Sequence, residues 1–162
     1  MHSELGVPME PDEISAAVVE GLEGLYRRRV PLLPHAVETV RALAGRWPLA
    51  VASSANRPLI DLVLELTGMA GLFRATVSSE EVPRGKPEPD VYLEAARRLD
   101  VVPERCVAVE DSTNGIRSAR AASMRVIAVP RPDFPPSPEA LQLADATLDS
   151  LSELEPALDK LS

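Results

Sequence analysis

The feature that most restricts the fold of this chain is a regular alternation between short apolar runs and amphipathic segments. Residues 48–52 and 105–109 form runs of the length of a buried strand, and each precedes a segment, 58–66 or 112–122, whose apolar residues recur at helical spacing. A further apolar run, 125–129, ends at a proline. Strands that alternate with helices predict a parallel sheet covered by helices on both faces, so we assign the chain to the α/β class.

The other predicted elements complete this alternation. Short strands are expected at 75–78 and 146–148, and helices at 11–29, 35–45, 90–99 and 151–161. In the first of these helices the apolar residues share one face, with acidic residues at its start and arginines at its end, as the helix dipole favours. A proline-rich segment then separates this helix from the rest of the chain.

The charge of the chain excludes several classes of partner. The formal net charge is −8 and the pI is about 4.8, so an acidic surface repels both nucleic acid and anionic membranes. The first residues lack the apolar region of a secretory signal, and no apolar stretch is long enough to span a bilayer, so we expect a cytoplasmic protein. The single cysteine, Cys106, lies in an apolar run and is expected to be a buried core residue, because one cysteine builds neither a disulfide framework nor a zinc site.

Small polar residues follow the first predicted strand. Ser53 and Ser54 come directly after the run that ends at residue 52, and Asn56 precedes the next helix. Ligands of parallel α/β sheets bind at the carboxyl ends of the strands, where hydroxyl groups and helix N-termini hold anions. The same residues are typical helix caps, so phosphate binding and simple capping both stay open for this segment.

A lysine stands in a rigid turn before the helix at 90–99. Lys86 lies between Gly85 and Pro87 in the sequence Gly-Lys-Pro-Glu-Pro-Asp, and the glycine and prolines fix the local backbone. Such a turn can aim the ammonium group inward as a point charge. An ordinary surface lysine is the alternative that this pattern leaves open.

Two adjacent carboxylates follow the apolar run at 105–109. Glu110 and Asp111 are followed at once by the helix at 112–122. Paired carboxylates at a strand end suit Mg²⁺, a hard cation that prefers oxygen ligands and keeps several waters. The alternative is structural, with Asp111 as the N-cap of the helix and Glu110 as a solvated acid.

These three features gain their meaning as a set, because all of them fall at strand ends or helix starts of one parallel sheet. An acidic chain needs a local cation to hold a phosphorylated substrate. Mg²⁺ can bridge the carboxylates to a phosphoryl group while a lysine and a hydroxyl neutralise and orient its other oxygens. We therefore predict a phosphoryl-transfer site in which Ser53, Ser54 and Lys86 bind phosphate, Ser53 and Lys86 act in catalysis, and Glu110 and Asp111 hold the metal.

The series of motifs resembles the haloacid dehalogenase-like hydrolase superfamily, in its branch of phosphatases and β-phosphoglucomutase-like enzymes. Residues 51–54 look like its second motif, residues 85–90 like its third and residues 109–112 like its fourth. The resemblance implies a Rossmann-like hydrolase core at 34–162, preceded at 1–33 by the remnant of a helical cap and a return linker. It also implies Mg²⁺ as cofactor and a small phosphorylated metabolite as substrate.

The chain departs from the family pattern in two ways. His35 and Ser123 occupy positions where relatives often carry glycine. The first motif, an Asp-x-Asp-Gly-Thr loop after an apolar strand, is absent, and no Asp-x-Asp occurs in the chain. In the family that motif supplies the nucleophile that forms an aspartyl-phosphate, the general acid/base and part of the Mg²⁺ shell. Its strand is central in the sheet, between the strands that carry the second and fourth motifs.

Physical consequences follow from this departure. Without the nucleophile the chain is expected to be inactive alone. Without the strand, its two neighbours lose backbone partners, so the chain should fold poorly unless a homodimer or a rearrangement fills the gap.

Other functions stay open beside phosphoryl transfer. A non-catalytic phosphate-binding or interaction protein of the same fold would keep the phosphate cradle without turnover. A dehalogenase of the same superfamily is disfavoured by the paired acids, since carbon–halogen chemistry needs no Mg²⁺. The substrate and the choice between phosphatase and mutase also stay open, because specificity in the family lies largely in the cap.

Overall fold

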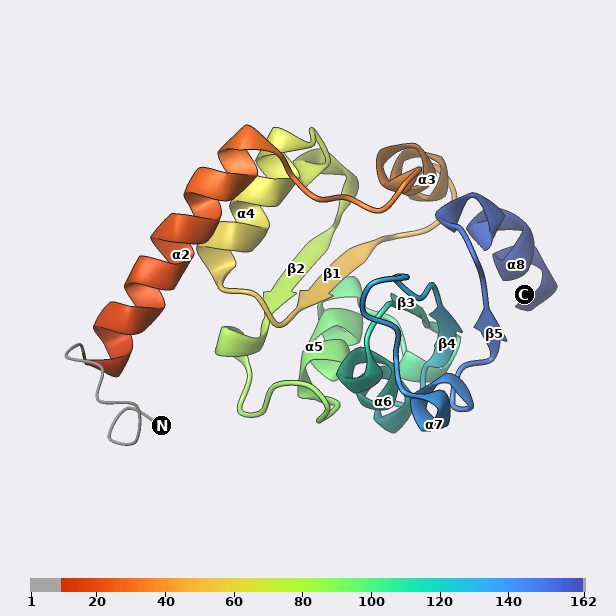
Figure 1. The fold of residues 1–162 in the computed structure, drawn as a ribbon. Helices are drawn as coiled ribbons and strands as arrows, with labels where there is room; N and C mark the ends of the chain where they lie inside the picture. The colour runs from red at the N-terminus through yellow and green to blue at the C-terminus, as the bar shows by residue number, and fades with distance from the viewer. Residues whose placement is uncertain (1–9, 162) are drawn as a thin grey trace.

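The computed structural model describes residues 10–161 and has the alternating order predicted from the sequence (Figure 1). Its helices are α2 (Pro11–Arg28), α3 (Ala36–Ala44), α4 (Arg57–Leu66), α5 (Asp90–Leu99), α6 (Thr113–Ala121), α7 (Pro138–Leu141) and α8 (Leu154–Leu161). Its strands are β1 (Ala50–Ser53), β2 (Ala75–Ser78), β3 (Val107–Glu110), β4 (Arg125–Ala128) and β5 (Ala146–Thr147). The α/β class is confirmed, and the ends of the predicted strands lie within about two residues of the observed ones, the usual scatter of such boundaries.

The strands form two parallel sheets where the sequence predicted one. β1 pairs with β2, and β3, β4 and β5 form the second sheet in that order. Within residues 10–161 no strand pairs with the inner edges of β1 and β3, which face each other across the molecule (Figure 1). The resemblance places its absent first strand at this position.

Helix α5 joins the two sheets through a shared core. Val77 of β2, Val91 of α5 and Ala108 of β3 are at most 5% exposed and belong to one cluster of buried side chains. Ala50 and Ala52 of β1 pack against the same cluster. Because these β1 and β3 residues are alanines, α5 can lie close to both sheets at once. The two sheets are therefore held side by side by side-chain packing.

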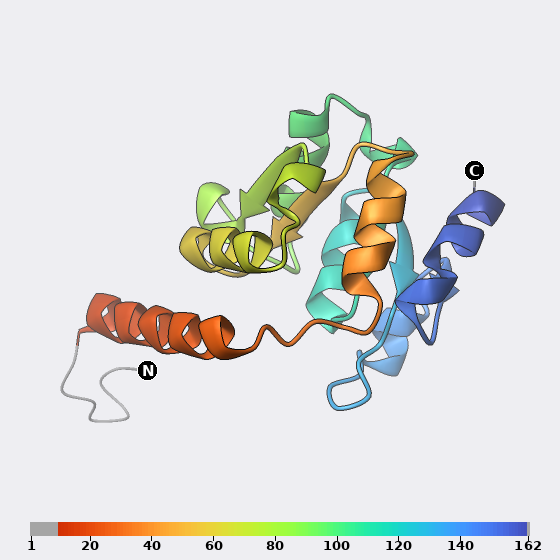
Figure 2. The same ribbon diagram turned by 90° about the horizontal axis from the view of Figure 1, so that it is seen from above.

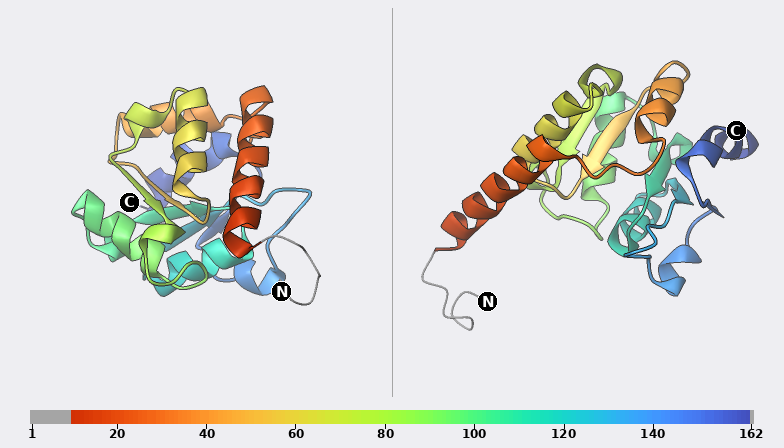
Figure 3. Two further views of the ribbon diagram at one scale, coloured as in Figure 1. Left: turned by 90° about the vertical axis from the view of Figure 1, so that its left-hand side faces the viewer. Right: turned by 45° about the horizontal axis from the view of Figure 1, so that its top comes forward.

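The opposite face is covered by α4 over the first sheet and by α3 and α8 over the second (Figures 1 and 2). Leu43 of α3 and Leu154 of α8 pack with Ile127 of β4 in a second buried cluster. Helix α2 packs along α4 and projects beyond the rest of the molecule (Figures 2 and 3). Among the helices of residues 10–161, none combines the length and the apolarity that a membrane span requires.

Two positions outside the regular elements explain one departure from the family pattern. His35 and Ser123 have φ angles of 64° and 63°, in the left-handed region. Glycine adopts this conformation without the steric cost that a Cβ atom brings, which accounts physically for the glycine of the family pattern.

The side chain of Cys106 is only partly buried. It packs against the core cluster around α5, and this burial raises the pKa of its thiol. The sequence therefore predicted its place in the core correctly and overestimated its burial.

Candidate functional site

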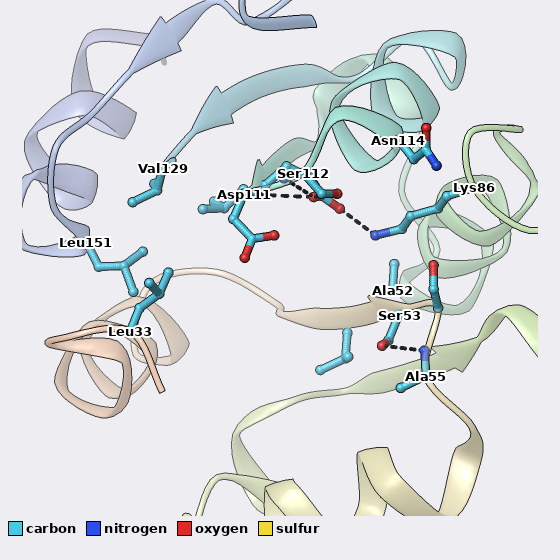
Figure 4. Close-up of a pocket in the computed structure, with 14 residues that line it drawn as sticks. Leu33, Ala52, Ser53, Ala55, Lys86, Asp111, Ser112, Asn114, Val129 and Leu151 are labelled. Atoms are coloured by element: carbon cyan, nitrogen blue, oxygen red, sulfur yellow. Dashed lines mark hydrogen bonds and ion pairs between the residues drawn. The ribbon is translucent and has the colours of Figure 1, made fainter. Parts of the chain in front are cut away.

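A cavity of about 480 Å³ opens between the carboxyl ends of β1 and β3 (Figure 4). All the site residues predicted from the sequence line it, namely Ser53, Ser54, Lys86, Glu110 and Asp111. They come from the end of β1, the turn before α5 and the end of β3, as the rule on strand ends predicts. The polar residues gather at one end of the cavity, and Leu33, Val129 and Leu151 line the other (Figure 4).

Lys86 and Glu110 form a buried ion pair beside this cavity. Their side chains are 10% and 6% exposed, and Lys86 Nζ donates to Glu110 Oε1. Tyr92 Oη on α5 donates to the same oxygen over 2.6 Å, and the centre of its ring lies 4.9 Å from the ammonium nitrogen. The turn thus aims Lys86 inward, and the alternative of an ordinary surface lysine is wrong.

The second oxygen of Glu110 is occupied as well. Glu110 Oε2 accepts from Ser112 Oγ over 3.0 Å and from the backbone N–H of Asp111 over 3.2 Å. Burial alone would raise the pKa of Glu110, but the Lys86 ammonium and the hydrogen bonds from Tyr92 and Ser112 outweigh it and lower that pKa. Burial and the adjacent Glu110 charge raise the pKa of Tyr92 far above its ordinary value. Glu110 is therefore an ionised carboxylate with both oxygens engaged by this chain.

Asp111 is placed differently from its neighbour. Its carboxylate points into the cavity (Figure 4), and among residues 10–161 no side chain donates to it. The structure therefore divides the predicted pair: Asp111 is free to bind a cation, whereas Glu110 is engaged by Lys86. Within the described residues no group of three or more His, Cys, Asp or Glu side chains is placed to hold a metal ion, and metal binding by Asp111 stays a prediction.

Helix α6 begins with a serine cap, and the alternative that made Asp111 its N-cap is wrong. Ser112 Oγ accepts from the backbone N–H of Gly115 over 3.0 Å while it also donates to Glu110. Gly115 leaves room for this arrangement, because a Cβ atom there would lie 1.9 Å from the carboxyl carbon of Glu110. The sequence interpretation missed Ser112, Gly115 and Tyr92. The sequence signal available for Ser112 and Gly115 was a serine that precedes a glycine by three residues at the start of a helix.

Ser53, the last residue of β1, and Ser54 are not explained by capping of the next helix. Ser53 Oγ accepts from the backbone N–H of Ala55 over 3.1 Å, which leaves its own hydrogen available to an acceptor in the cavity. Ser54 is exposed at the rim. The first N–H group of α4, that of Arg57, donates over 3.1 Å to the carboxylate of Glu80. Anion binding therefore remains the predicted role of both serines.

Comparison with known sequences identifies relatives of this chain. A family model of haloacid dehalogenase-like hydrolases matches residues 4–123. Hexitol phosphatase B of Escherichia coli (strain K12) is 40% identical over 144 residues, which cover 88% of this chain and 64% of the phosphatase. The fructose-1-phosphate phosphatase of the same strain is 32% identical over 121 residues, which cover 75% of this chain and 64% of that protein. The chain thus spans less than two thirds of the length of these two relatives.

Solved structures have the same fold. CbbY from Rhodobacter sphaeroides, crystallised in complex with phosphate, matches with a TM-score of 0.82 at 33% identity, over 91% of this chain and 67% of CbbY. β-Phosphoglucomutase from Clostridium difficile matches with a TM-score of 0.67 at 24% identity, over 80% of this chain and 56% of the mutase, and bears on the fold alone. The Rossmann-like fold that the motifs implied is confirmed.

Proposed function

This chain belongs to the haloacid dehalogenase-like hydrolase family, and we propose that it carries the phosphate- and metal-binding part of a Mg²⁺-dependent phosphatase for a small phosphorylated sugar. The observation that carries the proposal is the convergence of Ser53, Lys86 and Asp111 on one cavity at the carboxyl ends of β1 and β3. A hydroxyl, an ammonium group and a free carboxylate are the groups that hold a metal-bound phosphate monoester. The sugar substrate is proposed from the activities named for the relatives.

Each residue has a separate task in this proposal. Lys86, held by Glu110 and Tyr92, neutralises phosphoryl oxygens, and Ser53 donates its hydroxyl hydrogen to one of them. Asp111 would hold Mg²⁺, which suits a cation that takes one or two carboxylates together with water and substrate oxygens. The bound ion would supply charge neutralisation for the transferring phosphoryl group.

The nucleophile of the proposed reaction is not among the residues of this chain. No Asp-x-Asp pair occurs in the sequence, so the aspartyl-phosphate step requires an aspartate from outside it. We therefore propose that the chain alone binds phosphate without turnover. In the same scheme residues 1–33 are the remnant of a cap and its linker, and residues 34–162 are the hydrolase core.

A non-catalytic phosphate-binding protein is the second candidate, and the absence of Asp-x-Asp from the sequence is the observation that favours it. The two functions differ in what added residues achieve. If a version of the chain extended by the family's first motif hydrolyses p-nitrophenyl phosphate with Mg²⁺, the phosphatase is supported. A well-folded extended version without turnover supports the second candidate.

Phosphate binding by the chain itself tests both candidates. We expect calorimetry to show that inorganic phosphate binds to the chain in the presence of Mg²⁺. The double variant Lys86→Met, Glu110→Gln leaves no unpaired buried charge. Its affinity for phosphate should fall at least about tenfold, the effect of losing one strong charge-assisted contact. Lys160→Met is the matched control, because Lys160 is exposed on α8. Asp111→Asn should weaken the Mg²⁺ dependence, with the exposed Asp149→Asn as its control. Unchanged phosphate affinity in the double variant would refute the role given to Lys86.

A further inference from the structure

The packing of α5 requires the ring of Tyr92 but not its hydroxyl group. Tyr92 is 7% exposed and belongs to the buried face of α5. Phenylalanine would fill the same space, because it differs from tyrosine only by the hydroxyl. A buried hydroxyl costs free energy unless it is hydrogen-bonded, and both partners of this one, Glu110 and Lys86, belong to the candidate site. The ring therefore serves the core, and the hydroxyl serves the site.

Three polar atoms from three parts of the fold form a closed triangle. Lys86 Nζ, from the turn before α5, donates to Glu110 Oε1 of β3 and lies 3.5 Å from Tyr92 Oη. Tyr92 Oη donates to the same Glu110 oxygen over 2.6 Å, a length typical of a hydroxyl that donates to an ionised carboxylate. A phenol can donate one hydrogen bond and accept another at the same time. The position of the ammonium group is therefore fixed from two sides.

The hydroxyl of Tyr92 also completes the hydrogen bonding of Glu110. A carboxylate has about four lone-pair sites for donors. Oε1 accepts from Lys86 and Tyr92, and Oε2 accepts from Ser112 Oγ and from the backbone N–H of Asp111. Tyr92 thus occupies a site that a second N–H of the ammonium group could otherwise fill. An ammonium group has three N–H donors, and Lys86 lines the cavity, so one donor is left for an oxygen there (Figure 4).

We propose that Tyr92 is a positioning residue for phosphate binding, whose hydroxyl acts through Glu110 to keep the Lys86 ammonium at the cavity with one N–H free for a phosphoryl oxygen. Tyr92 is not among the residues that line the cavity, so it acts without touching the ligand. It also lies outside the residues that carry the family resemblance. Without the hydroxyl, Glu110 Oε1 gains a vacant lone pair and draws the ammonium group toward itself. The phosphate contact of Lys86 rests on the proposed function, whereas the triangle does not.

Tyr92→Phe removes the hydroxyl and keeps the ring. We expect its affinity for inorganic phosphate, measured by calorimetry with Mg²⁺ present, to fall roughly three- to tenfold, a part of what a hydrogen bond to a charged group contributes. Tyr26→Phe in α2 is the matched control, because no group among residues 10–161 hydrogen-bonds to the Tyr26 hydroxyl. That variant should bind phosphate as the wild-type chain does. Unchanged phosphate affinity in Tyr92→Phe would overturn the proposal.

A double-mutant cycle separates positioning from a general loss of stability. Urea denaturation identifies a temperature at which every variant is fully folded, and calorimetry is carried out there. In the Glu110→Gln background the charged link between the hydroxyl and the ammonium group is gone. Tyr92→Phe should then change the phosphate affinity by less than about twofold. An equal loss of affinity in both backgrounds would overturn the route through Glu110.

The ammonium group can be observed directly, because the sequence contains two lysines, Lys86 and Lys160. Labelling of lysine side chains with ¹⁵N gives one NMR signal for each, and Lys160, exposed on α8, is the internal reference. We expect the Lys86 hydrogens to exchange slowly with water in the wild-type chain and faster in Tyr92→Phe, with Lys160 unchanged. An unaltered Lys86 signal in Tyr92→Phe would overturn the proposal. If that variant does not fold, nuclear Overhauser contacts between the Lys86 ammonium and the Tyr92 ring in the wild-type chain test the same geometry, and their absence would overturn it.

The NMR measurement needs no phosphate, and this separates the inference from the proposed function. A Lys86 signal that responds to Tyr92→Phe, in a chain that binds no phosphate in calorimetry, would refute the proposed function and support the positioning of Lys86 by Tyr92. Phosphate affinity that is lost in the Lys86→Met, Glu110→Gln variant but kept in Tyr92→Phe would refute the inference alone.

Discussion

Substitution of Gly115 by alanine tests whether the buried Lys86–Glu110 pair organises the site. Gly115 lies in α6 with ordinary helical geometry, so alanine should stabilise the helix itself by about 1 kcal/mol. The new Cβ atom, however, would lie 1.9 Å from the carboxyl carbon and Oε2 of Glu110 and 2.1 Å from Oε1. The favourable separation of two non-bonded carbon atoms is about 3.5 Å, so the carboxylate has to move by more than about 1 Å.

That displacement breaks contacts of known strength. Glu110 Oε1 leaves Tyr92 Oη, now at 2.6 Å, and the ammonium of Lys86, while Oε2 leaves Ser112 Oγ, now at 3.0 Å. Breaking a buried ion pair costs about 3–5 kcal/mol. After subtracting the helix term of about 1 kcal/mol, we expect Gly115→Ala to lower the free energy of unfolding by about 2–4 kcal/mol.

Urea denaturation followed by circular dichroism measures this change, and a double-mutant cycle isolates its cause. In the Glu110→Ala background the clash is gone, so Gly115→Ala should there be neutral or stabilising. Gly24→Ala in α2, where no atom lies within 4 Å of the new Cβ, is a second control that should gain about 0.5–1 kcal/mol. An equal loss in both backgrounds, or no loss in the wild-type chain, would show that the carboxylate does not determine the need for glycine.

Two further predictions concern backbone strain and surface charge. Ser123→Gly should raise the free energy of unfolding by about 0.5 kcal/mol, because glycine removes the strain of the left-handed conformation. Gly68→Ala, at a φ of 66°, should lower the free energy of unfolding by about 1 kcal/mol. Urea denaturation measures both changes, and a change in the same direction in the two variants would refute the role of backbone strain. Hydrogen bonds from Arg97 and then Arg98 lower the pKa of Glu94 to about 2, so its contribution to stability is present above its ordinary value of 4.5 and is lost as the pH falls through 2. Replacing both arginines with glutamine should move the carboxyl titration in NMR back toward 4.5, and an unmoved midpoint would contradict the assignment.

The elements of the fold could be predicted because their signals are local. Apolar runs bounded by Pro, Ser or acidic residues predicted the strands, and apolar residues at helical spacing predicted the longer helices. Helix α7 was missed because four residues carry no periodicity. The closing helix was predicted from residue 151, but residues 151–153 form a 3₁₀ turn before α8, a common feature of helix ends. Division of the sheet could be inferred only through the family resemblance, since strand pairing is a non-local property.

The members of the candidate site could be predicted, but not how each is engaged. Strand ends and a rigid turn indicated Ser53, Lys86 and the two acids, because those positions converge in any parallel sheet. Which acid faces the cavity depends on partners far along the chain, such as Tyr92 for Glu110. In the sequence pattern, Tyr92 cannot be distinguished from the apolar residues on the buried face of α5. Pattern alone therefore treated Glu110 and Asp111 as equivalent, and only side-chain geometry separates them.

The two halves of the proposed phosphate site are held by different parts of the fold, and this affects what each half would contribute to phosphate affinity. Lys86 is fixed by Glu110 of β3 and by Tyr92 of α5, so its position does not depend on how β1 lies relative to β3. Ser53 ends β1, and within residues 10–161 β1 is held against β3 by side-chain packing and not by backbone pairing. The distance between the hydroxyl and the ammonium group is thus set across an unbridged gap. The contribution of Ser53 to phosphate affinity should therefore depend on how firmly side-chain packing holds β1 against β3, whereas the contribution of Lys86 should not.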